Sequence, residues 1–276
     1  MFASGLITLR EGLEAALIVG IVLGYLTQIG RPDRQKAVWA GVLAATTASI
    51  AATVVLQLLG ANFEGRSEQV FEGTTMFLAV AILTYMIFWM RYQGRHLREE
   101  LEQNVQAAVT RRQGWALAGL AFFAVFREGV ETALFLSAAG FATDGRSVLL
   151  GGLMGLAIAI ALGWLIFNSA VKIPLRHFFD VTSLLLLLFA AGLMAHGVHE
   201  FQEAGLLPTV FAPVWDINPI LSETSLLGSL LKTLFGYNGN PSLLESFSYV
   251  AYWILVLVGV HWWLERFVSQ PVGNSG

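Results

Sequence analysis

The chain has 276 residues, of which 56% are hydrophobic and only 13% are charged, and its formal net charge is −3. Soluble domains carry roughly 25% charged residues, so this composition excludes an ordinary soluble protein and predicts an integral membrane protein. The chain contains no cysteine, which excludes disulfides and thiolate metal sites. A metal site in this sequence must therefore use carboxylate, imidazole, amide or carbonyl donors. No motif points to nucleic acid.

Seven apolar segments predict an all-α polytopic membrane protein with seven transmembrane helices. A helix needs about 20 apolar residues to cross the ~30 Å hydrocarbon core of a bilayer. The segments that reach this length are 5–29, 37–60, 70–91, 115–141, 148–170, 181–204 and 247–267. The N-terminus lacks the basic region of a signal peptide, so we interpret the first segment as a mature span. We expect residues 1–276 to form a single transmembrane domain.

The distribution of Lys and Arg predicts the orientation of the chain. These residues gather in the first, third and fifth connections and after the last segment, namely Arg31, Arg34, Lys36, Arg91, Arg95, Arg98, Arg111, Arg112, Lys172, Arg176 and Arg266. The other connections contain only Arg66, Arg146 and Lys232. Because cytoplasmic loops carry the excess of Lys and Arg, we expect the N-terminus outside the cytoplasm and the C-terminus inside it.

A charged motif occurs in two of the apolar segments. It reads Arg10-Glu11-Gly12-Leu13-Glu14 in the first segment and Arg127-Glu128-Gly129-Val130-Glu131 in the fourth. One charge at bilayer depth costs at least ~2.5–3.5 kcal/mol, so three in one helix require a reason. Each arginine can partly neutralise the glutamate four positions later. Each motif then keeps a net negative charge and several oxygen donors, which is typical of a cation site.

The four glutamates of the two motifs are the predicted metal ligands. Together, Glu11, Glu14, Glu128 and Glu131 can supply a hard, oxygen-rich cage for a divalent or trivalent ion, and the bound ion would offset their mutual repulsion. We expect the two arginines to orient the carboxylates. The alternative is a pair of salt bridges that lock the two helices together. Buried ion pairs stabilise weakly and each motif has an excess acid, so the metal interpretation is preferred.

The repetition of the motif predicts an inverted repeat. The second copy follows the first by 117 residues and lies on a span of opposite direction. The third and sixth segments also match at their starts, because residues 71–75 (FEGTT) resemble residues 179–183 (FDVTS). We therefore predict that residues 5–91 and 115–204 are inverted repeats, with 247–267 as an additional helix. Transporters of this plan bind their substrate near the membrane midplane, where the repeats meet.

A second group of metal-binding side chains lies in the sixth segment. His196, His199, Glu200 and Glu203 share one helical face by their spacing, and we predict an outer capture site there. A polar helix end at the membrane interface is an equally good explanation. The spacing differs from the His-Glu-x-x-His motif of zinc hydrolases.

Two repeat-related acids begin the third and sixth segments on opposite sides of the membrane. Glu72 and Asp180 are predicted entrance and exit ligands. The alternative is that they are acids placed favourably at helix N-termini, which is worth a few tenths of a kcal/mol to about 1 kcal/mol.

The paired motif and the seven-span plan resemble the oxidase-dependent iron transporter family, which comprises high-affinity iron permeases of fungi and bacteria. The resemblance covers nearly the whole chain, and Val130 in place of leucine is its small departure. It implies that iron is the transported substrate and that no cofactor is bound permanently. It also implies that both motifs bind iron during permeation through Glu11, Glu14, Glu128 and Glu131, beside Arg10 and Arg127.

The resemblance also implies a location and partners. It places the chain in a bacterial inner membrane, with a periplasmic iron-binding protein and a periplasmic haem peroxidase as partners. Ferrous import is the general description of the bacterial systems, whereas an oxidising partner suggests Fe³⁺, so the oxidation state stays open. Carboxylates accept either ion.

The resulting hypothesis is an iron permease and not an enzyme. The alternatives are a permease for manganese or zinc, an intramembrane metal-dependent hydrolase that uses His196 and His199, and a purely structural membrane subunit. The sequence does not distinguish a channel from alternating access.

Overall fold

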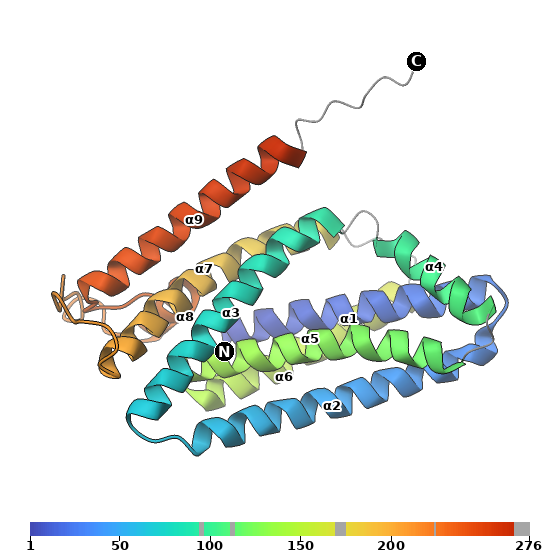
Figure 1. The fold of residues 1–276 in the computed structure, drawn as a ribbon, viewed down its shortest axis with the longest axis horizontal. Coiled ribbons are helices and arrows are strands. Elements are labelled where there is room, and N and C mark those ends of the chain that lie inside the picture. The colour runs from blue at the N-terminus through green and yellow to red at the C-terminus, as the bar shows by residue number, and fades with distance from the viewer. Residues whose placement is uncertain (94–96, 111–113, 169–174, 224, 268–276) are drawn as a thin grey trace.

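The computed structural model describes residues 1–93, 97–110, 114–168, 175–223 and 225–267, and these residues form helices and connections without strands (Figure 1). The all-α prediction is confirmed. In chain order the helices are α1 (Phe2–Gln28), η1 (Pro32–Arg34), α2 (Gln35–Ala61), α3 (Arg66–Gln93), α4 (Leu97–Thr110), α5 (Gly114–Ala142), α6 (Gly145–Asn168), α7 (Leu175–Glu203), α8 (Leu226–Phe235) and α9 (Leu243–Phe267).

Five helical segments of the described chain are long and apolar enough to cross a membrane. They are Pro32–Ala61, Arg66–Met90, Gly145–Ile166, Arg176–Glu203 and Leu243–His261. The seven predicted segments fall on these five and on α1 and α5, the helices that carry the charged motifs. The number of spans stays a prediction. Residues 169–170 of the fifth predicted segment, and Arg95, Arg111, Arg112 and Lys172, lie outside the described residues.

Large apolar side chains cover the outward faces of several helices. Leu43 on α2, Ile160 on α6 and Leu255 on α9 are each more than 60% exposed. Soluble proteins rarely expose continuous apolar faces of this kind, whereas a bilayer solvates them. The lipid interior offers no hydrogen-bond partners, which is why such apolar runs fold as helices, whose backbone groups bond within the segment. The chain is a multi-pass membrane protein.

The helices pack in a paired arrangement around α1 and α5. The two motif helices lie against each other and run in opposite directions, α2 packs along α5, and α6 packs along α1 (Figure 1). The other layer contains α3 and α7, which also run in opposite directions, with α9 against α7. The motifs therefore lie where α1 and α5 meet, the first one buried in the bundle and the second one partly exposed at Arg127 and Val130.

Glycines allow the close packing around the motif helices. A Cβ atom on Gly12 would lie 2.7 Å from the Cβ of Ala159 on α6, and one on Gly129 would collide with the Ser49 side chain on α2. Small residues at such contacts let helix backbones approach closely in lipid. Each motif glycine thus brings a neighbouring helix against the charged segment.

The connection between α7 and α9 folds back onto α7. Helix α8 ends at Gly236, which has a left-handed backbone (φ 65°) and whose amide donates to the carbonyl of Lys232. A Cβ atom at Gly236 would collide with the backbone of Gly192 on α7. Only glycine fits this contact, and it holds the end of α8 against the middle of α7.

Candidate metal site

The first motif is almost completely enclosed. Arg10 is 0% exposed, Glu11 1% and Glu14 7%. Nη1 of Arg10 lies 3.0 Å from Oε1 of Glu11, and Nη2 lies 3.3 Å from Oε1 of Glu14. One guanidinium therefore faces two carboxylates, and the motif keeps an excess negative charge in a region where charge is costly.

Helix α3 supplies the remaining contacts of Arg10. Its Nη1 donates to the sulfur of Met86 at 3.4 Å, and its Nη2 donates to the sulfur of Met90 at 2.8 Å. Thioethers are weak acceptors that carry no charge. They hold the guanidinium without competing with the glutamates for its charge. The sequence analysis did not identify these two methionines as part of the site.

The second motif has the same internal ion pairs but a different surrounding. Nε of Arg127 lies 3.0 Å from Oε1 of Glu131 and 3.5 Å from Oε1 of Glu128. Glu128 is 3% exposed, whereas the Arg127 side chain is 41% exposed. The guanidinium carbon lies 4.7 Å from the ring centroid of Trp89 on α3, a cation–π contact. Both motif arginines thus contact the same stretch of α3.

Carboxylates of the two motifs converge where α1 meets α5. Glu11, Glu128 and Glu131 each offer an oxygen, and these oxygens lie within 4.8 Å of one another. Oxygens bound to one cation at about 2.0–2.6 Å lie at most about 5 Å apart, so the geometry fits one hard ion. In all three residues Oε2 is buried and has no hydrogen-bond partner among the described residues. The arrangement is a cluster of three closely spaced carboxylates.

Glu14 lies beside this set of three carboxylates rather than within it. Its Oε1 is buried and makes no hydrogen bond among the described residues, although Arg10 lies nearby. It interacts electrostatically with Glu11 and Glu131. The four predicted glutamates are therefore close together, and three of them have the spacing of a shared ion.

The contact between the charged segments of α1 and α5 combines repulsion with attraction. The described ion pairs of Arg10 and Arg127 each join residues of one helix. Between the helices, carboxylates lie close to carboxylates, while Arg10 attracts Glu128 and Arg127 attracts Glu14.

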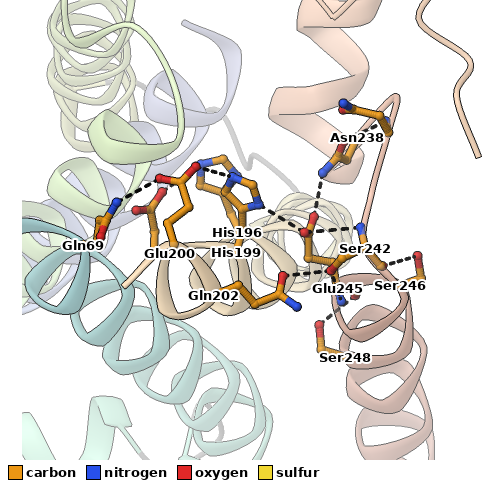
Figure 2. A network of polar contacts seen from close by, with 12 residues as sticks. Gln69, His196, His199, Glu200, Gln202, Asn238, Ser242, Glu245, Ser246 and Ser248 are labelled. Atoms are coloured by element: carbon orange, nitrogen blue, oxygen red, sulfur yellow. Dashed lines mark hydrogen bonds and ion pairs between the residues drawn. The ribbon is translucent and has the colours of Figure 1, made fainter. Parts of the chain in front are cut away.

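The four polar residues predicted on α7 also lie together, and α9 joins them (Figure 2). The two ring nitrogens of His199 lie 3.1 Å from Oε1 of Glu245 and 3.2 Å from Oε1 of Glu203. Nε2 of His196 lies 3.7 Å from Oε1 of Glu200. The group forms a polar network at the Glu203 end of α7.

Glu245 is a functional candidate that the sequence analysis did not identify. The structure places it in the first turn of α9 and buries it to 3% exposure. The Ser242 amide donates to its carboxylate at 3.3 Å, and its own amide donates to the Ser242 hydroxyl at 3.2 Å. This is a capping box, and its Ser-x-x-Glu signature is visible in the sequence.

Of the predicted entrance and exit ligands, only Glu72 lies with the α7 residues. Its carboxylate interacts electrostatically with Glu200 and Glu203. Asp180 is exposed near the opposite end of α7. Sixteen residues separate it from His196, which is about 24 Å of helix rise.

Comparisons with known proteins agree with this geometry. The profile of the iron permease FTR1 family matches residues 1–268. The ferrous iron permease EfeU of Escherichia coli O6:H1 (strain CFT073) is 40% identical over 273 residues, which cover 98% of this chain and 96% of the relative. EfeU of Yersinia pestis is 40% identical over 260 residues, covering 94% and 92% respectively. No solved structure matches the chain.

These relatives, together with the apolar helices, show the class of the protein. It is a multi-pass membrane transporter and not an enzyme. Within that class, the chain belongs to the iron permease FTR1 family. Iron is its transported substrate, and the hydrolase alternative is set aside.

Proposed function

We propose that the chain imports iron across a bacterial inner membrane through a transient site formed by Glu11, Glu14, Glu128 and Glu131. The observation that carries this proposal is the convergence of three carboxylate oxygens from two antiparallel helices, within 4.8 Å of one another. The free, buried Oε2 atoms of the same residues support it further, because an ion would give them a partner. The inward membrane potential favours cation uptake by ~2.3 kcal/mol per charge per 100 mV.

Fe²⁺ is the proposed ion at this site. The curated relatives carry the name ferrous iron permease, and carboxylates bind Fe²⁺ as well as Fe³⁺. The second proposed substrate is Fe³⁺, which a partner protein would produce by oxidation and deliver to the chain. A periplasmic iron-binding protein and a periplasmic haem peroxidase are the proposed partners, and iron passes as cargo with no resident cofactor.

We also propose that seven helices cross the membrane, as two inverted repeats of three and one additional helix. The contacts of the motif glycines support the repeat. Gly12 meets Ala159, and Gly129 meets Ser49. Gly129 of α5 follows Gly12 of α1 by 117 positions, and Ala159 of α6 follows Ser49 of α2 by 110 positions. The contact between α1 and α6 in one half therefore corresponds to the contact between α5 and α2 in the other. The pairing of α2 with α5 and of α6 with α1 follows the same relation. The N-terminus is proposed to lie in the periplasm and the C-terminus in the cytoplasm.

The test is iron uptake into proteoliposomes that contain this chain alone. We expect Glu11→Gln and Glu128→Gln each to lower the initial rate at least about tenfold, since even substitutions outside the ligand shell cost about 10–100-fold in metal affinity. Glu99→Gln on the exposed face of α4 is the matched control and should transport normally.

Two outcomes contradict the proposal in different ways. Normal uptake by both motif variants would remove the glutamates from the pathway. Stronger uptake of Mn²⁺ or Zn²⁺ than of Fe²⁺ by the unmodified chain would favour the permease for another metal.

A further inference from the structure

We propose that the Glu203 end of α7 holds a second metal site, which binds first-row transition ions through His196 and Glu200. Its role is to discriminate iron from Ca²⁺ and Mg²⁺ before the ion reaches the motif glutamates. This inference rests on the proposed iron uptake.

His196 and Glu200 are placed as two ligands of one ion. They lie four positions apart on α7, with Nε2 and Oε1 separated by 3.7 Å. That distance is too long for a hydrogen bond. Two donors on one tetrahedral ion, each bound at about 2.0–2.2 Å, lie about 3.4 Å apart, so a small rotamer adjustment closes the site.

Glu200 is a buried acid that faces His196. It is 8% exposed, and its Oε1 lies 3.7 Å from Nε2 of His196. The charges of Glu203 and Glu68 act on it unfavourably and that of His199 favourably, and Glu200 in turn acts unfavourably on Glu72. A carboxylate enclosed among like charges favours a bound cation, which satisfies its oxygens and offsets the repulsion.

His199 and Glu203 support the site and do not bind the ion. Both ring nitrogens of His199 already face carboxylates, at 3.1 Å from Glu245 and 3.2 Å from Glu203. Glu245 also accepts a hydrogen bond from the Asn238 side chain at 2.7 Å (Figure 2). The His199 ring stacks on that of His196, with centroids 5.8 Å apart. His199 therefore packs against the His196 ring.

A cavity of about 140 Å³ lies between α7 and the segment that carries α8, and it reaches the site at His196 but not at Glu200. His196, His199 and Glu245 line it, together with Glu223 and Lys232. The Lys232 ammonium lies 2.9 Å from Oε2 of Glu223, so a carboxylate neutralises the cavity's lysine. Water takes about 30 Å³ per molecule in the liquid, so this volume admits an ion with part of its hydration shell.

The donor types explain why two sites are useful. The motif site offers only carboxylate oxygens, which suit Mg²⁺, Ca²⁺ and Mn²⁺ as well as iron. An imidazole nitrogen at the second site favours Fe²⁺ and Zn²⁺ over the alkaline-earth ions. The two sites are separate, because Glu72 lies fourteen residues from Met86 on α3, about 21 Å of helix rise, and Met86 contacts Arg10.

The experiment isolates the second site with Co²⁺ as a spectroscopic probe. The purified full-length chain carries Glu11→Gln and Glu128→Gln together, which disables the motif site. We expect this double variant to keep one Co²⁺, with absorption bands typical of nitrogen ligation, in a large excess of Ca²⁺. Adding His196→Gln or Glu200→Gln should weaken Co²⁺ binding at least about tenfold. Adding His177→Gln, an exposed histidine at the other end of α7, should leave it unchanged.

Transport provides the second arm, with the motifs intact. Excess Ca²⁺ should inhibit iron uptake by the His196→Gln chain and leave uptake by the unmodified chain unaffected. The inference is overturned if the double variant binds no Co²⁺, or if binding survives both His196→Gln and Glu200→Gln. Circular dichroism and gel filtration establish that each variant is folded. Failure of the proposed function would show differently, as iron uptake that persists without the motif glutamates.

Discussion

The two motif arginines have the same sequence neighbours and different environments. Arg10 is completely buried, with two carboxylates and two thioethers around it, whereas Arg127 is 41% exposed and rests on Trp89. The cost of removing a charged group depends on whether its partners stay buried without it. The repeat of the motif therefore does not make the two positions energetically equivalent.

We expect Arg10→Ala to lower the free energy of unfolding by about 3–5 kcal/mol, because it leaves Glu11 and Glu14 as unpaired buried acids. Arg127→Ala should cost less than Arg10→Ala, because solvent reaches the 41% exposed Arg127 side chain and screens its pairs, although Glu128 stays buried. Thermal unfolding of both variants in the same detergent measures the difference. Equal losses would show that burial does not decide the role of these arginines.

Among the helices, close packing against α1 and α5 depends on individual glycines. Gly12 and Gly129 each meet a small residue of the adjacent helix, whereas Gly24 on the same α1 helix has open space where a Cβ would lie. The motif carboxylates are fixed relative to the rest of the bundle through these contacts. A change that separates α2 from α5 would thus also displace Glu128.

Gly129→Ala should destabilise the protein by about 1–3 kcal/mol, since overpacking forces the backbones apart. Ser49→Gly on α2 should restore part of this loss, because the colliding group is the Ser49 side chain. Gly24→Ala is the control and should be neutral or slightly stabilising. Unfolding temperatures of the three variants and the double variant test this, and a Gly24→Ala loss as large as that of Gly129→Ala would contradict it.

For the molecule as a whole, the absence of cysteine allows a direct test of orientation. A single introduced cysteine is then the only thiol in the chain. We expect Ser67→Cys, at the start of α3, to react with a membrane-impermeant thiol reagent added to spheroplasts, and Gln103→Cys on α4 to react only after lysis. The reverse pattern would invert the proposed topology.

Much of this architecture follows from the sequence because it depends on local pattern. Length and apolarity predicted the seven long helices that the structure describes, and three of the four glutamates of the repeated motif lie within 4.8 Å of one another. The partners of Arg10 on α3 depend on how helices cross, which no local pattern encodes, so Met86 and Met90 were missed. Glu245 was missed for a different reason, since its capping box was visible but was not used.

The face-to-face carboxylates couple the ion to the fold itself. Like charges held together inside a protein lower its free energy of unfolding. An ion that binds between them raises this free energy again, and it does so more when it binds more tightly. Ion binding at the proposed site and the stability of the fold are thus thermodynamically linked. An ion that the carboxylates bind weakly stabilises the fold only a little. Under the proposed function, the bundle is least stable without a bound ion, so this loss of stability opposes release of the ion into the cytoplasm.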